Sequence, residues 1–154
     1  MNYQLAVARP SHIDAMVKLC VSAYYDGPES ATPNVDKIKQ YIGMMVRDDH
    51  QLALVVLVNG SPKGLVIGEV SEHAFTDGIV ASDTVIYVKR SLRGTSAARD
   101  LIEAYSAWCE RIPNLSASTL GISQLGASTQ YLDKVYRDCG YGKMGITYGK
   151  ENRA

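Results

Sequence analysis

The sequence predicts a mixed α/β (α+β) fold, with a central β-sheet and helices on both faces, in a single domain spanning residues 1–154. The first observation is length, because 154 residues suit one domain with one core. The second is periodicity, because segments with a helical spacing of apolar residues alternate with short β-branched runs. The third is composition, because 46% hydrophobic and 21% charged residues are typical of a globular domain that folds unaided.

In the first half of the chain, capping and turn residues separate the expected elements. Ser11 suits the N-cap of a first helix, and Asn34 or Asp36 suits the N-cap of a second. The turn sequence NGSPKG lies between two apolar runs, which predicts a β-hairpin. The expected order is a strand at 3–8, a helix at 9–25, a helix from 34–36 to the region 47–50, and a hairpin within 51–75.

The second half of the chain alternates strands with helices. Leu101, Ile102 and Tyr105 share one side of the clearest helix of the sequence, and Pro113 marks its end. Gly140 suits the left-handed C-cap of a later helix. The expected order is a strand at 81–90, a helix at 98–112, a strand at 116–125, a helix at 128–141 and a final strand at 143–150.

Charge and cysteine usage exclude several classes of partner. Sixteen Lys and Arg residues balance sixteen Asp and Glu residues, so we expect neither a nucleic acid nor an acidic membrane as partner. Cys20, Cys109 and Cys139 fit neither a disulfide framework nor a metal site, and they favour a reducing compartment. No segment approaches the ~20 apolar residues of a membrane span. We therefore expect a cytoplasmic protein without a metal site.

The stretch YVKRSLRGTSAARDLIEAY, residues 87–105, places two arginines and several small residues where a strand passes into a helix. Backbone amides at a helix start lack acceptors within the helix, and the helix dipole makes that end attractive to phosphate. Small residues would let a pyrophosphate reach these amides, and Arg90 and Arg93 could add charge-assisted hydrogen bonds. The same residues also suit a tight turn with two solvated arginines, and they do not decide between the two interpretations.

The segment 87–102 resembles the acetyl-coenzyme A binding motif of the GNAT superfamily of N-acetyltransferases. That motif reads Arg or Gln, two residues, Gly, one residue, then Gly or Ala. Arg93, Ser96 and Ala98 fill its three positions. Ser96 stands where the family usually has glycine, which predicts a tighter approach of phosphate to the loop.

A second resemblance lies downstream, where VYRDCGY is similar to the family's pattern of Tyr, three residues, Gly and an aromatic residue. Tyr136, Gly140 and Tyr141 fill this pattern. The expected order of elements also resembles that of the family. Together these resemblances imply a GNAT-like mixed central sheet of about six to seven strands flanked by about four helices.

The resemblance also implies the activity, which is transfer of an acetyl group from acetyl-coenzyme A to an amine. A backbone N–H near Val88 would stabilise the oxyanion, and Tyr136 would protonate the departing thiolate as general acid. The general base is not identified, and its candidates are Glu69, Glu72, His73 and Asp83. The residues implied to bind the cofactor are Tyr87, Val88, Arg93, Gly94, Thr95, Ser96, Ala97 and Ala98.

The acceptor amine in this family meets the loop between the first two helices. In this chain Tyr24, Tyr25 and Asp26 begin that loop and suit a cationic amine on a small molecule or a protein. A homodimer is a further expectation. The alternative to an enzyme is a GNAT-like module that binds coenzyme A or a partner without catalysis, which Ser96 and the unidentified base favour.

Overall fold

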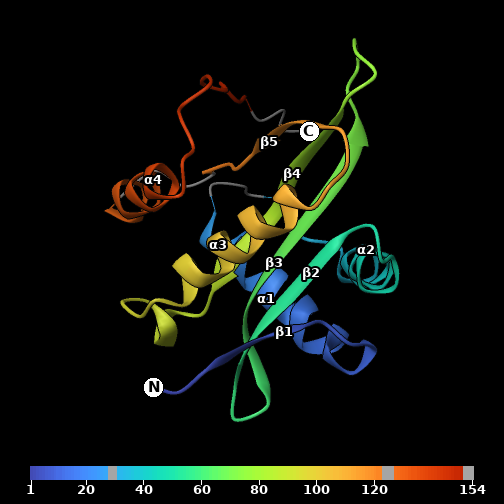
Figure 1. Ribbon diagram of the computed structural model, residues 1–154. Helices are drawn as coiled ribbons and strands as arrows, with labels where there is room; N and C mark the ends of the chain where they lie inside the picture. The colour runs from blue at the N-terminus through green and yellow to red at the C-terminus, as the bar shows by residue number, and fades with distance from the viewer. Residues whose placement is uncertain (28–30, 123–126, 151–154) are drawn as a thin grey trace.

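The computed structural model describes residues 1–27, 31–122 and 127–150. Its elements form one five-stranded sheet in the order β1-β2-β3-β4-β5, flanked by helices (Figure 1). The pairs β1–β2, β2–β3 and β3–β4 are antiparallel, and the pair β4–β5 is parallel. The elements are β1 (Gln4–Val7), α1 (Ile13–Asp26), α2 (Val35–Arg47), β2 (Leu52–Val58), β3 (Ser61–Glu72), β4 (Ile79–Val88), α3 (Ala97–Glu110), β5 (Leu115–Thr119) and α4 (Ala127–Asp138), with short 3-10 turns at Pro10–His12 and Arg90–Leu92.

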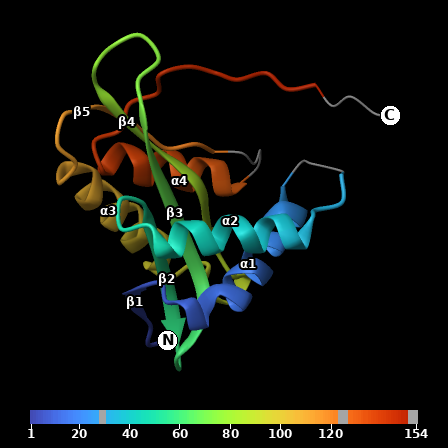
Figure 2. The same cartoon turned by 90° about the vertical axis from the view of Figure 1, so that its right-hand side faces the viewer.

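The two faces of the sheet carry separate apolar clusters, because successive side chains of a strand point to opposite faces. Val55 and Ile67 pack under α1 and α2, which lie side by side (Figure 2). Val56 and Val66 pack under α3, which crosses the opposite face. The fully buried Tyr105 anchors α3 there. The mixed sheet with helices on both faces is the fold class that the sequence predicts.

The hairpin between β2 and β3 is tighter than the six-residue turn that the sequence suggests. Asn59 and Gly60 alone connect the strands, with φ of 50° and 76°. Two positive φ values in a two-residue connection are the geometry of a type I′ turn, which Asn-Gly favours. The predicted hairpin is confirmed, and Ser61, expected in the turn, begins β3.

Two of the three predicted helix caps are confirmed. Asn34 caps α2, because its side chain accepts a hydrogen bond from the amide of Lys37 at 3.0 Å. Gly140 follows α4 with φ of 89°, the left-handed conformation expected for it. Ser11 does not cap the first helix, because it lies inside a 3-10 turn and His12 is the N-cap of α1. Pro10 fits the first position of that turn, where its missing N–H costs nothing.

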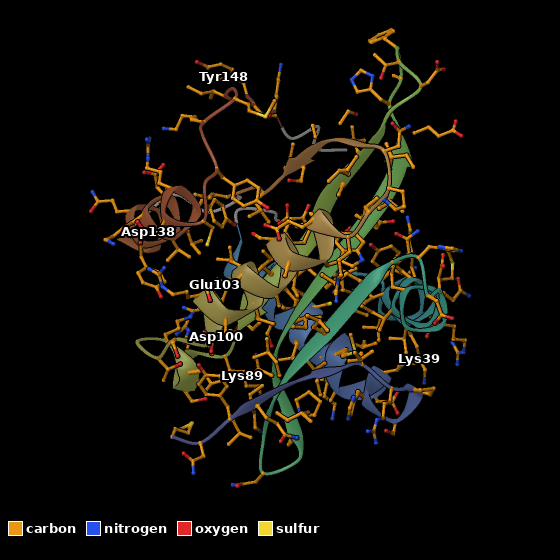
Figure 3. All side chains as sticks on the ribbon, in the orientation of Figure 1. Lys39, Lys89, Asp100, Glu103, Asp138 and Tyr148 are labelled. Atoms are coloured by element: carbon orange, nitrogen blue, oxygen red, sulfur yellow. The ribbon has the colours of Figure 1, made fainter. Side chains whose placement is uncertain are left out.

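The predicted strand at 143–150 is wrong, since no strand is present between residues 141 and 150. The apolar alternation of this segment is real, but Met144, Ile146 and Tyr148 are all exposed, and Tyr148 lies away from the sheet (Figure 3). An alternating pattern forms a strand only where one face finds a surface to pack against. The described sheet therefore has five strands rather than six to seven. No helix of the described ranges is long and apolar enough to cross a bilayer.

Candidate active site

Strands β4 and β5 separate halfway along β4. Their pairing covers residues 79–82 of β4 and ends where Ser82 meets Thr119. From residue 83 to 88, β4 keeps only β3 as a partner within the described part of the chain. The backbone groups on its other edge therefore face a cavity of about 600 Å³. This cavity is lined by Ala23, residues 83–88, Leu92, Arg93, Gly94, Thr95, Ala98, Gly121, Ile122, Tyr131, Leu132 and Tyr136.

A β-bulge in β4 lies at the point where the strands part. Gly68 of β3 pairs with Asp83, and Ile67 pairs with Val85, so Thr84 is an extra residue without a partner in the register. The bulge reverses the alternation of the strand. Ala81 packs in the cluster under α3, whereas Val85 packs in the cluster under α1 and α2. Such bulges bend the strand and re-aim its side chains.

Asp83 and Tyr136 meet at one peptide segment beside the cavity. An oxygen of the Asp83 carboxylate accepts a hydrogen bond from the amide of Gly121 at 2.9 Å. The Tyr136 hydroxyl donates to the carbonyl of the same Gly121 at 2.8 Å. Tyr136 is 7% exposed and packs with Val135 and Ile102. The two predicted catalytic groups, from β4 and α4, thus border one cavity.

The environment of this pair keeps both groups in their protonated forms to higher pH than usual. Burial raises the pKa of Asp83, and the hydrogen bond from Gly121 offsets part of that rise. Burial also raises the pKa of Tyr136, and the nearby Asp83 charge adds to that effect. A carboxyl with a raised pKa is a better proton acceptor near neutral pH, and a neutral phenol retains a proton to donate.

The start of α3 forms the second wall of the cavity. Gly94 has φ of 86°, which a side chain would strain, and this turn brings the chain from β4 onto the helix. The amide of Asp100 donates to the carbonyl of Ser96, the N-cap residue, so the three preceding amides have no acceptor within the helix, and that of Ala97 donates to the Thr95 hydroxyl at 3.3 Å. Six predicted cofactor residues line the cavity: Tyr87, Val88, Arg93, Gly94, Thr95 and Ala98. The other two, Ser96 and Ala97, do not line it, and Ala97 is fully buried.

The two predicted anion-binding arginines both contact a carboxylate of the first helix. Arg93 lies 2.9 Å and Arg90 lies 3.2 Å from oxygens of Asp26. Tyr87 also donates to Asp26, at 3.1 Å. Although burial acts to raise it, these hydrogen bonds and the arginine charges lower the pKa of Asp26. Asp26 is predicted to bind the acceptor. In the structure its carboxylate instead forms ion pairs with the two arginines that are predicted to bind a pyrophosphate.

The other predicted acceptor residues lie near this ion pair. Tyr25 is 63% exposed and, with Asp26, lines a second and more open hollow of about 450 Å³ beside Lys89 and Arg90. The ring of Tyr24 lies 6.1 Å from that of Tyr25, edge to face, and lines neither hollow. Tyr25 and Asp26 share this second hollow, and Tyr24 lies apart from it.

Glu69, the other predicted catalytic residue, lies outside the cavity. Its carboxylate accepts hydrogen bonds from Tyr41 of α2 at 2.7 Å and from Thr84 at 2.5 Å. These contacts place it on the face covered by α2, opposite Asp83. Tyr41 and Thr84 are not predicted from the sequence, because neither the contact of Tyr41 with Glu69 nor the bulge that displaces Thr84 carries a local signal. Gly121 is not predicted either, because it contributes only backbone groups.

Comparisons with known proteins support the fold. No family model matches the chain, and no curated protein matches it. A ribosomal-protein-alanine N-acetyltransferase from Brucella melitensis biovar Abortus 2308 is 18% identical over 99% of this chain and 100% of that one, with a TM-score of 0.69. The aminoglycoside acetyltransferase AAC(6')-Iy, in complex with a bisubstrate analogue of coenzyme A, is 16% identical over 100% of both chains, with a TM-score of 0.72.

A plant structure gives the same result. Glucosamine-6-phosphate N-acetyltransferase from Arabidopsis thaliana is 11% identical over 98% of this chain and 99% of that one, with a TM-score of 0.70. These proteins are acetyltransferases with the GNAT fold, and the likeness extends over nearly the whole chain. The chain therefore has the GNAT fold that its two motifs imply.

Proposed function

We propose that the protein is an acetyl-coenzyme A dependent N-acetyltransferase that moves the acetyl group to a primary amine by direct attack. One observation carries the proposal: the open edge of β4, the start of α3 and the Asp83–Tyr136 pair all border one cavity. The fold supports it, because the similar structures named above are acetyltransferases, one of them crystallised with a coenzyme A conjugate.

The residues present fit the cofactor. The first-turn amides of α3 and the guanidinium of Arg93 suit a pyrophosphate, since oriented amides and a cation bind anions together. The edge of β4 that has no partner strand among the described residues suits a ligand that carries amide groups, because every second strand residue offers a donor and an acceptor to that side. When bound, acetyl-coenzyme A supplies an activated acyl group as a thioester.

Asp83 acts in the proposal as the general base. A lysine-like acceptor has a pKa of about 10.4 and carries a proton at neutral pH that must leave before nitrogen can attack. Asp83 takes that proton, and its raised pKa suits the task. Glu69 is disfavoured for this role, because its carboxylate already accepts hydrogen bonds from Tyr41 and Thr84 and does not line the cavity.

Tyr136 acts as the general acid. With acetyl-coenzyme A bound, the Tyr136 phenol would give its proton to the sulfur as the carbon–sulfur bond breaks, and would regain a proton from the nitrogen that has formed the new carbon–nitrogen bond. Because burial raises its pKa, the Tyr136 phenol is neutral at physiological pH and has a proton to donate. The backbone N–H groups at the open edge of β4, up to Val88, are suited to stabilise charge on the carbonyl oxygen.

The acceptor is proposed to be a small-molecule primary amine. Two similar structures act, by their names, on amino sugars: an aminoglycoside and glucosamine 6-phosphate. In this chain Tyr25 offers an aromatic surface in the second hollow, whereas the Asp26 carboxylate beside it is already paired with Arg90 and Arg93. A protein amine, a cytoplasmic location and a homodimer stay predictions.

The test is release of free thiol from acetyl-coenzyme A with a panel of primary amines. The Tyr136→Phe variant should lose about 100-fold in kcat, the lower range for a lost general acid, while its affinity for acetyl-coenzyme A changes little. Tyr141→Phe is the matched control, because its hydroxyl contacts Ser106 at 3.2 Å and lies outside the cavity lining. Binding without thiol release on any amine would favour the alternative, a catalytically inactive module.

A further inference from the structure

Tyr3, which precedes β1, reaches the start of α3 across more than ninety residues of sequence. Its hydroxyl forms a hydrogen bond with the hydroxyl of Ser96. It also donates to the carboxylate of Asp100 at 2.5 Å. The ring packs against the apolar cluster under α3. One phenol thus binds the side chains of both Ser96 and Asp100. The Ala97 amide donates to the Thr95 hydroxyl at 3.3 Å, so the first-turn amides left for an anion are those of Ala98 and Arg99.

Ser96 would ordinarily compete with an anion at this position. A serine at the N-cap usually accepts a hydrogen bond from an amide of the first turn, and that amide is then occupied. In α3 the Ser96 side chain forms no such bond, although Ser96 is the N-cap residue. Its hydroxyl is held by Tyr3 instead, and Ser96 does not line the cavity.

Asp100 would compete in a different way. It is the acidic residue of the first turn of α3 (Figure 3), where a carboxylate is attracted by the same dipole that attracts a phosphate. Asp100 does not line the cavity, and Tyr3 donates to its Oδ2. The hydrogen bond fixes the carboxylate on the side of the helix that faces β1.

We propose that Tyr3 is a positioning residue that holds the Ser96 hydroxyl and the Asp100 carboxylate away from the α3 amides, so that these amides stay available to the pyrophosphate of coenzyme A. This inference rests on the proposed function, because it concerns the same cofactor site. It explains how the chain accommodates serine at the position where the motif that this segment resembles has glycine. The Ser96 hydroxyl, which could block the loop, is bound to Tyr3 and does not line the cavity.

The test is a double-mutant cycle on affinity for coenzyme A, measured by titration calorimetry with Tyr3→Phe and Ser96→Gly. Tyr3→Phe keeps the ring and its packing but releases both partners. We expect about fivefold weaker binding, the fold-change that corresponds to one helix-cap hydrogen bond of ~1 kcal/mol. Adding Ser96→Gly to Tyr3→Phe should restore much of the affinity, since the freed hydroxyl is then absent.

Kinetics separate positioning from a general structural role. The KM for acetyl-coenzyme A should rise in Tyr3→Phe, while kcat at saturation stays that of the wild type. Tyr141→Phe is again the matched control, because it removes a phenol that contacts a serine hydroxyl at 3.2 Å away from the cofactor loop. Equal affinity of Tyr3→Phe and wild type, or the same loss with and without Ser96→Gly, would overturn the inference.

A second result is independent of Tyr3 variants. If Tyr3 already holds the hydroxyl away, Ser96→Gly alone leaves the affinity close to that of the wild type. A clear gain in affinity from Ser96→Gly alone would show that the hydroxyl obstructs the loop, and would overturn the inference. Failure of the wild type itself to bind coenzyme A refutes the proposed function instead, so the two failures are distinguishable.

Discussion

Replacing Asp26 by asparagine should strengthen binding of coenzyme A. The Asp26 carboxylate contacts both arginines of the loop, at 3.2 Å and 2.9 Å. A pyrophosphate that binds Arg93 must therefore compete with a carboxylate already on it. Asparagine keeps the size of the side chain and an oxygen that can accept from Tyr87, but it removes the competing charge. The same change should lower the stability of the ligand-free protein.

The magnitude follows from the exposure of the partners. The side chains of Arg90 and Arg93 are 78% and 45% exposed, while that of Asp26 is 19% exposed. Ion pairs at such positions contribute about 0.2–1 kcal/mol each. Two of them sum to ~1 kcal/mol, which corresponds to about fivefold tighter binding. Since salt screens exposed charges, the difference should shrink as ionic strength rises.

Titration calorimetry with coenzyme A at low and high ionic strength measures this effect. Asp14→Asn is the matched control. Asp14 also lies on the first helix, and the change removes the same charge from an exposed ion pair with Lys39 of α2 (3.0 Å). The control should leave the affinity unchanged. Equal or weaker binding by Asp26→Asn at low salt would refute the competition, and would assign Asp26 to holding Arg93 in place for the cofactor.

Two further predictions concern stability. Gly68→Ala should lower the free energy of unfolding by about 1–3 kcal/mol in denaturant melts, because the new Cβ would lie 2.9 Å from the Trp108 ring, whereas Gly142→Ala should be neutral. The stability of Asp83→Asn relative to the wild type should increase as pH rises from 3.5 to 7, because the wild type loses stability over this range. Because burial raises the pKa of Asp83, its stabilising contribution is complete below about 3.9 and is lost above the raised pKa; a constant difference contradicts this.

Local patterns were sufficient to predict most elements and the strand-to-helix turn that borders the cavity. The Asn-Gly turn, the Asn34 cap and the Gly140 cap each depend on residues that are close in sequence. Six of eight predicted cofactor residues line the cavity, because a strand-to-helix turn is itself a local structure. The false strand at 143–150 came from the same kind of pattern, since alternation does not reveal whether a partner strand exists.

The contacts that shape the site join distant parts of the chain, and no local pattern encodes them. Asp26 meets Arg93, and Tyr3 meets Ser96, only because the fold brings α1 and the first strand to the same end of β4. Each of these residues is unremarkable in its own segment, as a polar residue at a helix end or beside a strand. Their roles follow from tertiary packing, which periodicity does not report.

The bulge at Thr84 accounts for both the cavity and the position of its carboxylate. Before Thr84, β4 pairs with β3 and β5, and after it the part of the chain that the structure describes gives β4 only β3 as a partner. An extra residue bends a strand and reverses its alternation. The bend accompanies the opening beside β5. Asp83 faces Gly121 and Thr84 faces Tyr41, as successive strand residues do, and the reversal then places Val85 on the same face as Thr84. Strict alternation through Thr84 would place Val85 on the face of Asp83, so the bulge lets one strand bury apolar residues under α1 and still present an acid to the cavity.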